Sequence, residues 1–413
     1  MLELHNKYGP IVRTGPSELA FFTPEGFKDI YTERIGHKLA LKHRSHYPLP
    51  PNAADNIVTA EPILQSYVDT FVRKLRERAS AGPVDIRSWF NFVIFDITGD
   101  LMFGEAFGCL EESRLHDWIE LLFGTAKAYS YLMAVHQFPL FRALLERMIP
   151  PSNMQKILDR FNMTAEKTDK RLSTQTDRPD IITFALGNGL KSEEVPGSLG
   201  DRTMTRAELH SNAYVIIGAG SEEPATHLAG YMYYLATHPP QRHRLRQEIR
   251  STFQTDADIT LAKIAKMPYL NAIIDESFRI YSPFVTSLPR VVQDGGDTIA
   301  SETVPAGTTI ACHLYASFHS PQNFVMAENF LPEPWLGQDA QFANDRRDVL
   351  RPASLGPRGC IGKALGYAEI RLVLCKLLWH FDARLSDASR NWLDQDVFFI
   401  WGKPALMVEL VES

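Results

Sequence analysis

The sequence predicts a mainly α-helical fold with a small β part, and three patterns carry this prediction. Apolar residues recur at helical spacing over residues 63–75 and again over 92–102. A capping-box signature at Thr205 opens a helical segment that runs to about His238, roughly 50 Å at 1.5 Å per residue. Strand-like alternation is found over residues 8–22 and 288–312. We therefore expect the long helix to lie at the centre of a helical protein.

The remaining elements follow from turn and capping residues. Pro24 stands at the start of a helix that reaches Tyr31, and Pro305-Ala306-Gly307 forms a turn between two strands. Further helices are predicted over residues 268–281 and 363–379, and loops over 42–62 and 187–202. The sequence contains no internal repeat, low-complexity tract or linker, so residues 1–413 are expected to form a single domain.

Composition excludes several classes of protein. The chain has 413 residues, 45% of them apolar and 22% charged, as in a soluble globular protein. A net charge of −6 without a basic block argues against nucleic acid or an anionic membrane as a partner. The four cysteines show no paired spacing, and no run reaches the roughly 18 apolar residues that a spanning helix needs. A cytoplasmic chain that lacks a membrane anchor is expected.

The glycine-rich segment 354–362 reads Ser-Leu-Gly-Pro-Arg-Gly-Cys-Ile-Gly and directly precedes the last predicted helix. A thiolate bound to haem iron needs backbone that can pass close to a flat macrocycle, and it gains from N–H groups at a helix N-terminus. Gly356, Arg358, Cys360 and Gly362 match the pattern of cytochromes P450, which the chain resembles over nearly its whole length. The resemblance implies haem as cofactor, Cys360 as the iron ligand and Arg358 as a partner of a haem propionate.

A second motif lies upstream. Glu276 and Arg279 share a helix face and can form an ion pair, although most pairs at this spacing are exposed and indicate little alone. Within residues 269–279 they resemble the P450 core helix, whose ion pair lies beneath the haem. Arg290, in Leu-Pro-Arg-Val, matches the next family element and implies a second propionate partner. The chain looks closest to fungal members that modify secondary metabolites, and the implied fold is the family's triangular prism with a long central helix.

The long helix departs from the family pattern at residues 219–224, Ala-Gly-Ser-Glu-Glu-Pro. Glu222 occupies the family's acidic position, and Glu223 replaces the threonine that takes part in proton delivery. Pro224 removes a helix N–H and is expected to sharpen any kink. Two interpretations stay open: Glu223 is a new acid or hydrogen-bond donor that burial keeps protonated, or it reflects drift after oxygen chemistry was lost. Glu222 and Glu223 are the candidate catalytic residues, and Cys360 is expected to face this helix across a cavity.

Three further departures concern the haem surroundings. Ala353 replaces an aromatic residue, which leaves the thiolate less covered, and Pro334 replaces the arginine that completes a network with Glu276 and Arg279. Loss of one member of such a network costs about 3–5 kcal/mol. Between residues 59 and 61 the chain passes directly into a later helix, so a family helix that supports the propionates and docks the reductase is expected to be missing.

Three hypotheses of function follow. The first is a haem-thiolate monooxygenase that tailors a hydrophobic terpenoid- or polyketide-like metabolite with electrons from an NADPH-dependent reductase, in the cytoplasm or peripheral to the endoplasmic reticulum. The second is a cyclase or isomerase on the same scaffold, for example a Diels–Alder type pericyclase, with or without haem. The third, a non-catalytic relic, has no positive support. Substrate contacts are expected from residues 47–56, Tyr214, Ile217, Gly218, 285–287 and 398–401.

Overall fold

The computed structural model describes residues 1–42, 60–116, 130, 151–174, 176, 178–187, 189–190, 203–398 and 400–412. The chain divides into two compact units, one made of Met1–Pro50 and Lys266–Lys363 and the other of Pro51–Ala265 and Ala364–Ser413. Neither unit is a contiguous segment. The single-domain organisation expected for residues 1–413 stays a prediction.

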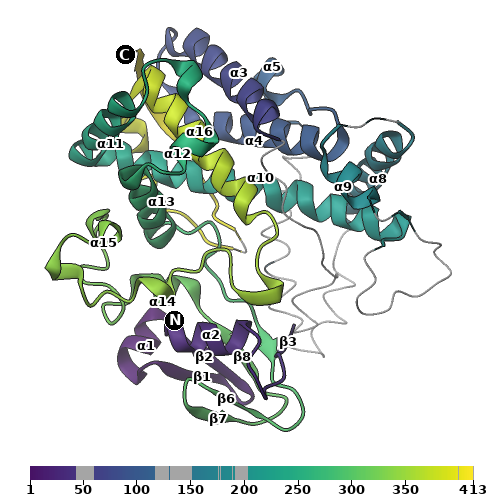
Figure 1. The fold of residues 1–413 in the computed structure, drawn as a ribbon, viewed down its shortest axis with the longest axis vertical. Coiled ribbons are helices and arrows are strands. Elements are labelled where there is room, and N and C mark those ends of the chain that lie inside the picture. Colours follow the sequence, from purple (N-terminus) through teal and green to yellow (C-terminus); the bar gives the residue numbers. More distant parts are fainter. Residues whose placement is uncertain are drawn as a thin grey trace. The chain divides into compact units, whose positions relative to one another are not determined.

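The first unit combines a small mixed sheet with short helices (Figure 1). Its five-stranded sheet has the order β1-β2-β8-β5-β3, in which β2 and β8 are parallel and the other neighbours are antiparallel. β6 and β7 form a separate ribbon. The strands are β1 Ile11–Gly15, β2 Glu18–Phe21, β3 Leu41–Lys42, β5 Arg290–Val291, β6 Asp297–Ile299, β7 Glu302–Val304 and β8 Thr309–Cys312. The α-helices are α1 Leu2–Tyr8, α2 Pro24–Tyr31, α13 Pro268–Ile280, α14 Leu314–His319 and α15 Glu333–Leu336, and the 3₁₀ turns are η3 Ala340–Phe342, η4 Arg347–Val349 and η5 Gly356–Arg358.

Local sequence explains the start of this unit. The hairpin predicted for residues 8–22 is β1–β2. The side chain of Thr23 then accepts a hydrogen bond from the Gly26 N–H, and Pro24 holds the first turn of α2, where its missing N–H costs nothing. Gly307 has a φ of +76°, as the predicted turn at Pro305-Ala306-Gly307 requires. These predictions are confirmed.

The second unit is mostly helical. Its α-helices are α3 Glu61–Ala79, α4 Ile86–Phe103, α5 Cys109–Glu112, α8 Pro151–Leu172, α9 Ile181–Leu186, α10 Arg206–Thr237, α11 Pro239–Thr252, α12 Leu261–Ile264 and α16 Lys363–His380, the last starting at the boundary residue. Its strands β4 Val84–Asp85, β9 Phe381–Leu385 and β10 Met407–Glu412 form a sheet of order β4-β10-β9, and its 3₁₀ turns are η2 Asp256–Asp258 and η6 Asp387–Ser389.

The long helix α10 organises this unit (Figure 1). Thr205 Oγ1 accepts from the Glu208 N–H at 3.1 Å and Glu208 Oε2 accepts from the Thr205 N–H at 2.8 Å, which is the predicted capping box. The helix has 32 residues, continues through Pro224 and packs against α4, whose own residues are buried on almost every side. A Cβ at Gly220 would lie 3.3 Å from the Thr98 methyl group, so glycine permits this close approach of the two helices.

The mainly helical fold with a small β part is confirmed. The helices predicted over 268–281 and 363–379 are α13 and α16, which end one residue from the predicted positions. Residues 43–59 and 191–202, where two loops were predicted, lie outside the described residues, and so does the segment just before residue 60 where a helix was expected to be missing. In the described part of the chain, no helix has the length and apolar character needed to cross a membrane.

Candidate functional site

Cys360 lies on a loop that backbone hydrogen bonds close between η5 and α16. The Cys360 N–H donates to the Ala353 carbonyl at 2.8 Å, and the Gly359 N–H donates to the Gly356 carbonyl at 2.9 Å. Gly356 has a φ of +67°, and a Cβ there would stand 2.2 Å from the Tyr31 carbonyl oxygen. The close approach and the positive φ together explain why glycine stands at position 356. A Cβ at Gly362 would lie 4.0 Å from the Cys360 Sγ, so that side of the thiol is also uncrowded.

Cys360 is the exposed member of the four cysteines, all of which are free thiols. Burial raises the pKa of the Cys109 and Cys375 thiols to about 12 and that of Cys312 well above its ordinary value. These three thiols stay protonated at neutral pH and are poor metal ligands, because the thiolate is the form that binds metal. The environment of Cys360 is therefore the one that suits the predicted role as metal ligand.

Cationic side chains gather in the same unit. Arg290 on β5 is buried, and its guanidinium carbon lies 5.2 Å from the centroid of the Tyr31 ring. Lys42 on β3 pairs with Arg290 in the sheet register. Burial and then the charges of Arg290 and Arg358 lower the pKa of Lys42, which means that the three cations lie within electrostatic reach of one another. Such a group favours an anionic ligand, as predicted for Arg290 and Arg358.

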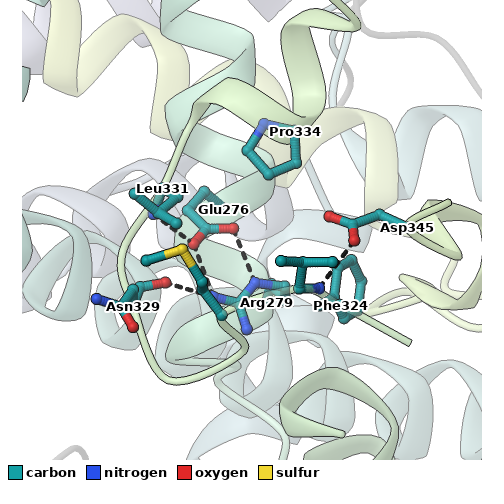
Figure 2. A pocket seen from close by; sticks show the side chains of 9 residues that line it. Glu276, Arg279, Phe324, Asn329, Leu331, Pro334 and Asp345 are labelled. Carbon is teal, nitrogen blue, oxygen red and sulfur yellow. Dashed lines mark hydrogen bonds and ion pairs between the residues drawn. The ribbon is translucent and has the colours of Figure 1, made fainter. Parts of the chain in front are cut away.

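Glu276 and Arg279 form a buried ion pair on α13, as their spacing predicted (Figure 2). Arg279 Nη2 donates to Glu276 Oε1 at 2.7 Å, and Arg279 Nε donates to Glu276 Oε2 at 2.8 Å. The other donors of the guanidinium reach the carbonyl oxygens of Phe318, Ala327 and Asn329 at 3.0, 2.6 and 2.8 Å. All five donors are thus satisfied, which buried arginine requires.

The loss of arginine at position 334 is compensated by neutral donors. Glu276 Oε1 also accepts from the Leu331 N–H at 2.8 Å, and Glu276 Oε2 accepts from Trp335 Nε1 at 2.9 Å. Each carboxylate oxygen therefore has two donors, so the network is complete without a second cation. Pro334 lines a small hollow beside the pair, about 160 Å³ including its mouth to solvent (Figure 2). The cost expected from Pro334 is offset by its neighbour Trp335.

Glu222 of α10 is paired with a lysine from the C-terminal segment. Its Oε1 accepts from Lys403 Nζ and, at 2.9 Å, from Thr226 Oγ1, while Lys403 Nζ also donates to Thr226 Oγ1. The Lys403 and Glu222 side chains are only 1% and 6% exposed. Glu222 Oε2 is buried and accepts no hydrogen bond within the described residues.

The surroundings of Glu223 differ from those of Glu222, the residue before it. Burial, and after it the charge of Glu222, raises the pKa of Glu223 from 4.5 to about 7. His227 lies one turn further along α10, fully buried, and burial lowers its pKa to about 3, so it stays neutral. At neutral pH Glu223 is therefore a carboxyl group poised between its two protonation states. The two interpretations of Glu223 stay predictions.

The structure gathers the predicted site residues into two sets, one in each unit. The first unit holds the residues predicted to bind or support haem, which are Cys360, Gly356, Gly362, Arg290, Arg358, Glu276 and Arg279. The second unit holds Glu222 and Glu223. That Cys360 faces α10 across a cavity stays a prediction. Of the expected substrate contacts, Tyr214, Ile217 and Gly218 lie on α10, and residues 47–56 lie outside the described part.

Sequence reasoning missed Lys403, Thr226, Trp335 and Lys42. Thr226 could have been found, because it stands four residues after Glu222 on the same helix face. Trp335 adjoins the proline that breaks the family pattern. Lys403 and Lys42 had no local signal, since their partners lie 181 and about 250 residues away along the chain.

Gly356→Ala should lower the free energy of unfolding more than Gly307→Ala does. Both glycines have positive φ, which costs an alanine about 1–2 kcal/mol. Only Gly356 also stands against backbone, whereas a Cβ at Gly307 meets nothing within 4 Å. Urea denaturation followed by circular dichroism measures both losses. Equal losses would show that the contact with Tyr31 has no energetic weight.

Trp335→Phe should destabilise the protein by about 1–3 kcal/mol, because it leaves a buried carboxylate one donor short. Trp392→Phe is the matched control. Trp392 is more deeply buried than Trp335, but its Nε1 donates to the neutral carbonyl of Pro404 at 3.1 Å, so the loss of this hydrogen bond should cost less. Calorimetric or chemical unfolding of both variants tests the order, and a larger loss for Trp392→Phe would contradict the role given to Trp335.

The stability of the wild type relative to Glu223→Gln should fall as pH rises. The carboxyl pKa is 4.5 in the unfolded chain and about 7 in the folded one, so the folded state binds the proton more tightly. The stabilising contribution is fully present at low pH and is lost between these two values. Unfolding free energies of both proteins from about pH 5 to pH 8 measure the difference. A difference that does not change with pH would mean that Glu223 titrates normally.

Comparisons with known proteins agree with these features. The family model for cytochrome P450 matches residues 41–408. The chain is 37% identical to cytochrome P450 monooxygenase efuB of Hormonema carpetanum, over 99% of this chain and 85% of that protein. It is 37% identical to trichothecene C-15 hydroxylase of Fusarium sporotrichioides, over 99% and 87% of the two chains, and 38% identical to averantin hydroxylase of Dothistroma septosporum, over 99% and 80%. The chain therefore belongs to the cytochrome P450 family, the haem-thiolate enzymes.

Proposed function

We propose that this chain is a P450 monooxygenase that oxidises a hydrophobic, terpenoid- or polyketide-like secondary metabolite, with electrons from an NADPH-dependent reductase. The observation that carries the proposal is the Cys360 loop, which combines an exposed thiol, glycines on both sides and nearby cations. The relatives support it, because they are fungal monooxygenases and two of them are hydroxylases. A place in the cytoplasm or at the surface of the endoplasmic reticulum belongs to the same proposal.

Haem iron is the family's cofactor, and the residues of the first unit fit it. A haem presents two anionic propionates, and Arg290, Arg358 and Lys42 form a cationic group that suits them. Cys360 would hold the iron, and Gly356 and Gly362 leave room beside it. When bound, haem supplies the oxidising chemistry that amino-acid side chains lack.

Glu223 is the residue that we assign to proton transfer. A carboxyl group with a pKa near 7 can both give and take a proton at its Oε atoms at the working pH. It stands where the family has threonine, so the assignment replaces a hydroxyl by a carboxyl group. Apolar side chains of α10, such as Ile217, would line the substrate pocket and exclude water.

The raised pKa of Glu223 also favours a second candidate function, a cyclase or isomerase of the pericyclase kind. A neutral carboxylic acid can donate a hydrogen bond to a substrate carbonyl. One donor placed where charge develops is worth roughly 3 kcal/mol, about a hundredfold in rate. In that case Cys360 and haem would contribute nothing to turnover.

Cys360→Ala and two substitutions of Glu223 decide between the candidates. For a monooxygenase, Cys360→Ala should abolish turnover. It should also abolish the absorbance of the reduced carbonyl complex that gives the family its name. Glu223→Thr should keep or improve the coupling of NADPH consumption to product formation. For a cyclase, Cys360→Ala should keep activity, and Glu223→Ala should lose about a hundredfold. Turnover of terpenoid and polyketide substrates is measured with and without reductase and NADPH.

Cys375→Ala is the control for the thiol substitution, because Cys375 is buried within α16 and its thiol stays protonated. It should retain the absorbance of the wild type. A protein whose turnover depends on neither Cys360 nor Glu223 would contradict both candidate functions.

A further inference from the structure

The two adjacent glutamates of α10 have different surroundings, although they are neighbours in sequence. Glu222 Oε1 is bound by Lys403 Nζ and by Thr226 Oγ1, and both the acid and the lysine are buried. Glu223 has no ion pair within the described residues and is half-buried. The charge of Glu222 acts on Glu223 and, after burial, raises the pKa of the Glu223 carboxyl group. Within the described residues, Glu222 has a cationic partner in Lys403 and Glu223 has none.

We propose that Lys403 is a positioning residue that keeps Glu222 ionised, so that the proton of the acidic pair resides on Glu223. The inference rests on the proposed function, in which Glu223 transfers a proton or donates a hydrogen bond. It divides the roles of the two candidate catalytic residues: Glu222 is the fixed charge, and Glu223 is the group that acts. Thr226 supports the division, because its hydroxyl accepts from Lys403 and donates to Glu222.

Hydrogen bonds anchor the backbone on both sides of Lys403. The Gly402 N–H donates to the Asp396 carbonyl at 2.9 Å, and Trp392 Nε1 donates to the Pro404 carbonyl at 3.1 Å. Leu406 lies two residues after Pro404, and its N–H donates to Asp85 Oδ1 at 2.9 Å, next to the start of α4. These bonds hold the segment against the rest of its unit on both sides of Lys403.

Other charged groups do not replace Lys403 in the described part of the chain. Arg87 of α4 pairs with Asp85. Burial lowers the pKa of Lys403 most, Glu222 opposes this by raising it, and Arg87 lowers it slightly further. Burial keeps His227 and Glu369 neutral. Three charged groups on the elements packed against α10 have partners elsewhere. Asp96 of α4 binds the N–H groups of Cys109 and Leu110, Asp169 of α8 binds Arg206 and His210, and Arg242 of α11 binds Asp382 of β9.

The protonation of Glu223 can be followed directly by infrared spectroscopy. The carbonyl band of its neutral carboxyl group is assigned by its loss in Glu223→Gln and is then titrated with pH in the substrate-free protein. Glu222→Gln removes the neighbouring charge, so the Glu223 band should titrate about one pH unit lower, or more. Lys403→Met should give the same shift and a new carboxyl band, because Glu222 without a counter-charge takes up a proton. That new band should be absent from the double variant that carries both Lys403→Met and Glu222→Gln.

Lys376→Met is the matched control. Lys376 is also a buried lysine of this unit, 3% exposed, but it pairs with Asp69 and Asp256. It should leave the Glu223 titration unchanged even where it lowers stability. Should Lys403→Met not fold, Glu222→Gln alone decides. A Glu223 titration that is the same in the wild type, Glu222→Gln and Lys403→Met overturns the proposal.

Failure of this proposal and failure of the proposed function give different results. If the Glu223 band shifts as described while turnover is indifferent to Glu223, the role of Lys403 holds and the catalytic role of Glu223 is wrong. If turnover depends on Glu223 but its band does not respond to Glu222 or Lys403, the proton-transfer function stands and the positioning role is overturned.

Discussion

The buried ion pair of Glu276 and Arg279 is the interaction on which the first unit depends. The guanidinium holds three backbone carbonyls between Phe318 and Asn329 as well as the carboxylate, and the carboxylate in turn holds Leu331 and Trp335. One helix thereby fixes a stretch of chain that has little regular structure of its own. A charge removed from water must be fully satisfied, and that requirement determines the path of this segment.

The second unit follows the same rule at Lys403. There the buried pair joins the C-terminal segment to the middle of α10, and its consequence is chemical as well as structural. Within the described residues the ammonium group contacts Glu222 and not Glu223, so the two acids have unequal surroundings, and burial, followed by the charge of Glu222, raises the pKa of Glu223 to about 7.

Departures from the family pattern have different consequences in the two units. In the first unit, where Pro334 stands in place of the expected arginine, Trp335 and a backbone N–H donate to Glu276, so its carboxylate is fully hydrogen-bonded with one cation fewer. In the second unit, the change from threonine to Glu223 introduces a titratable group in place of a neutral one. The first departure is conservative in effect, whereas the second changes the available chemistry.

Local sequence determined the elements and the cysteine loop. Three local features act over only a few residues, so the structure around them could be predicted from the sequence. They are the capping box at Thr205, Pro24 at a helix start and the glycines around Cys360. The pair Glu276–Arg279 could be predicted too, because both partners lie on one helix face. The different surroundings of Glu222 and Glu223 could not be predicted. Only the tertiary structure decided them, since it brings Lys403 to Glu222 from 181 residues away, and a charge buried there needs a partner of opposite sign.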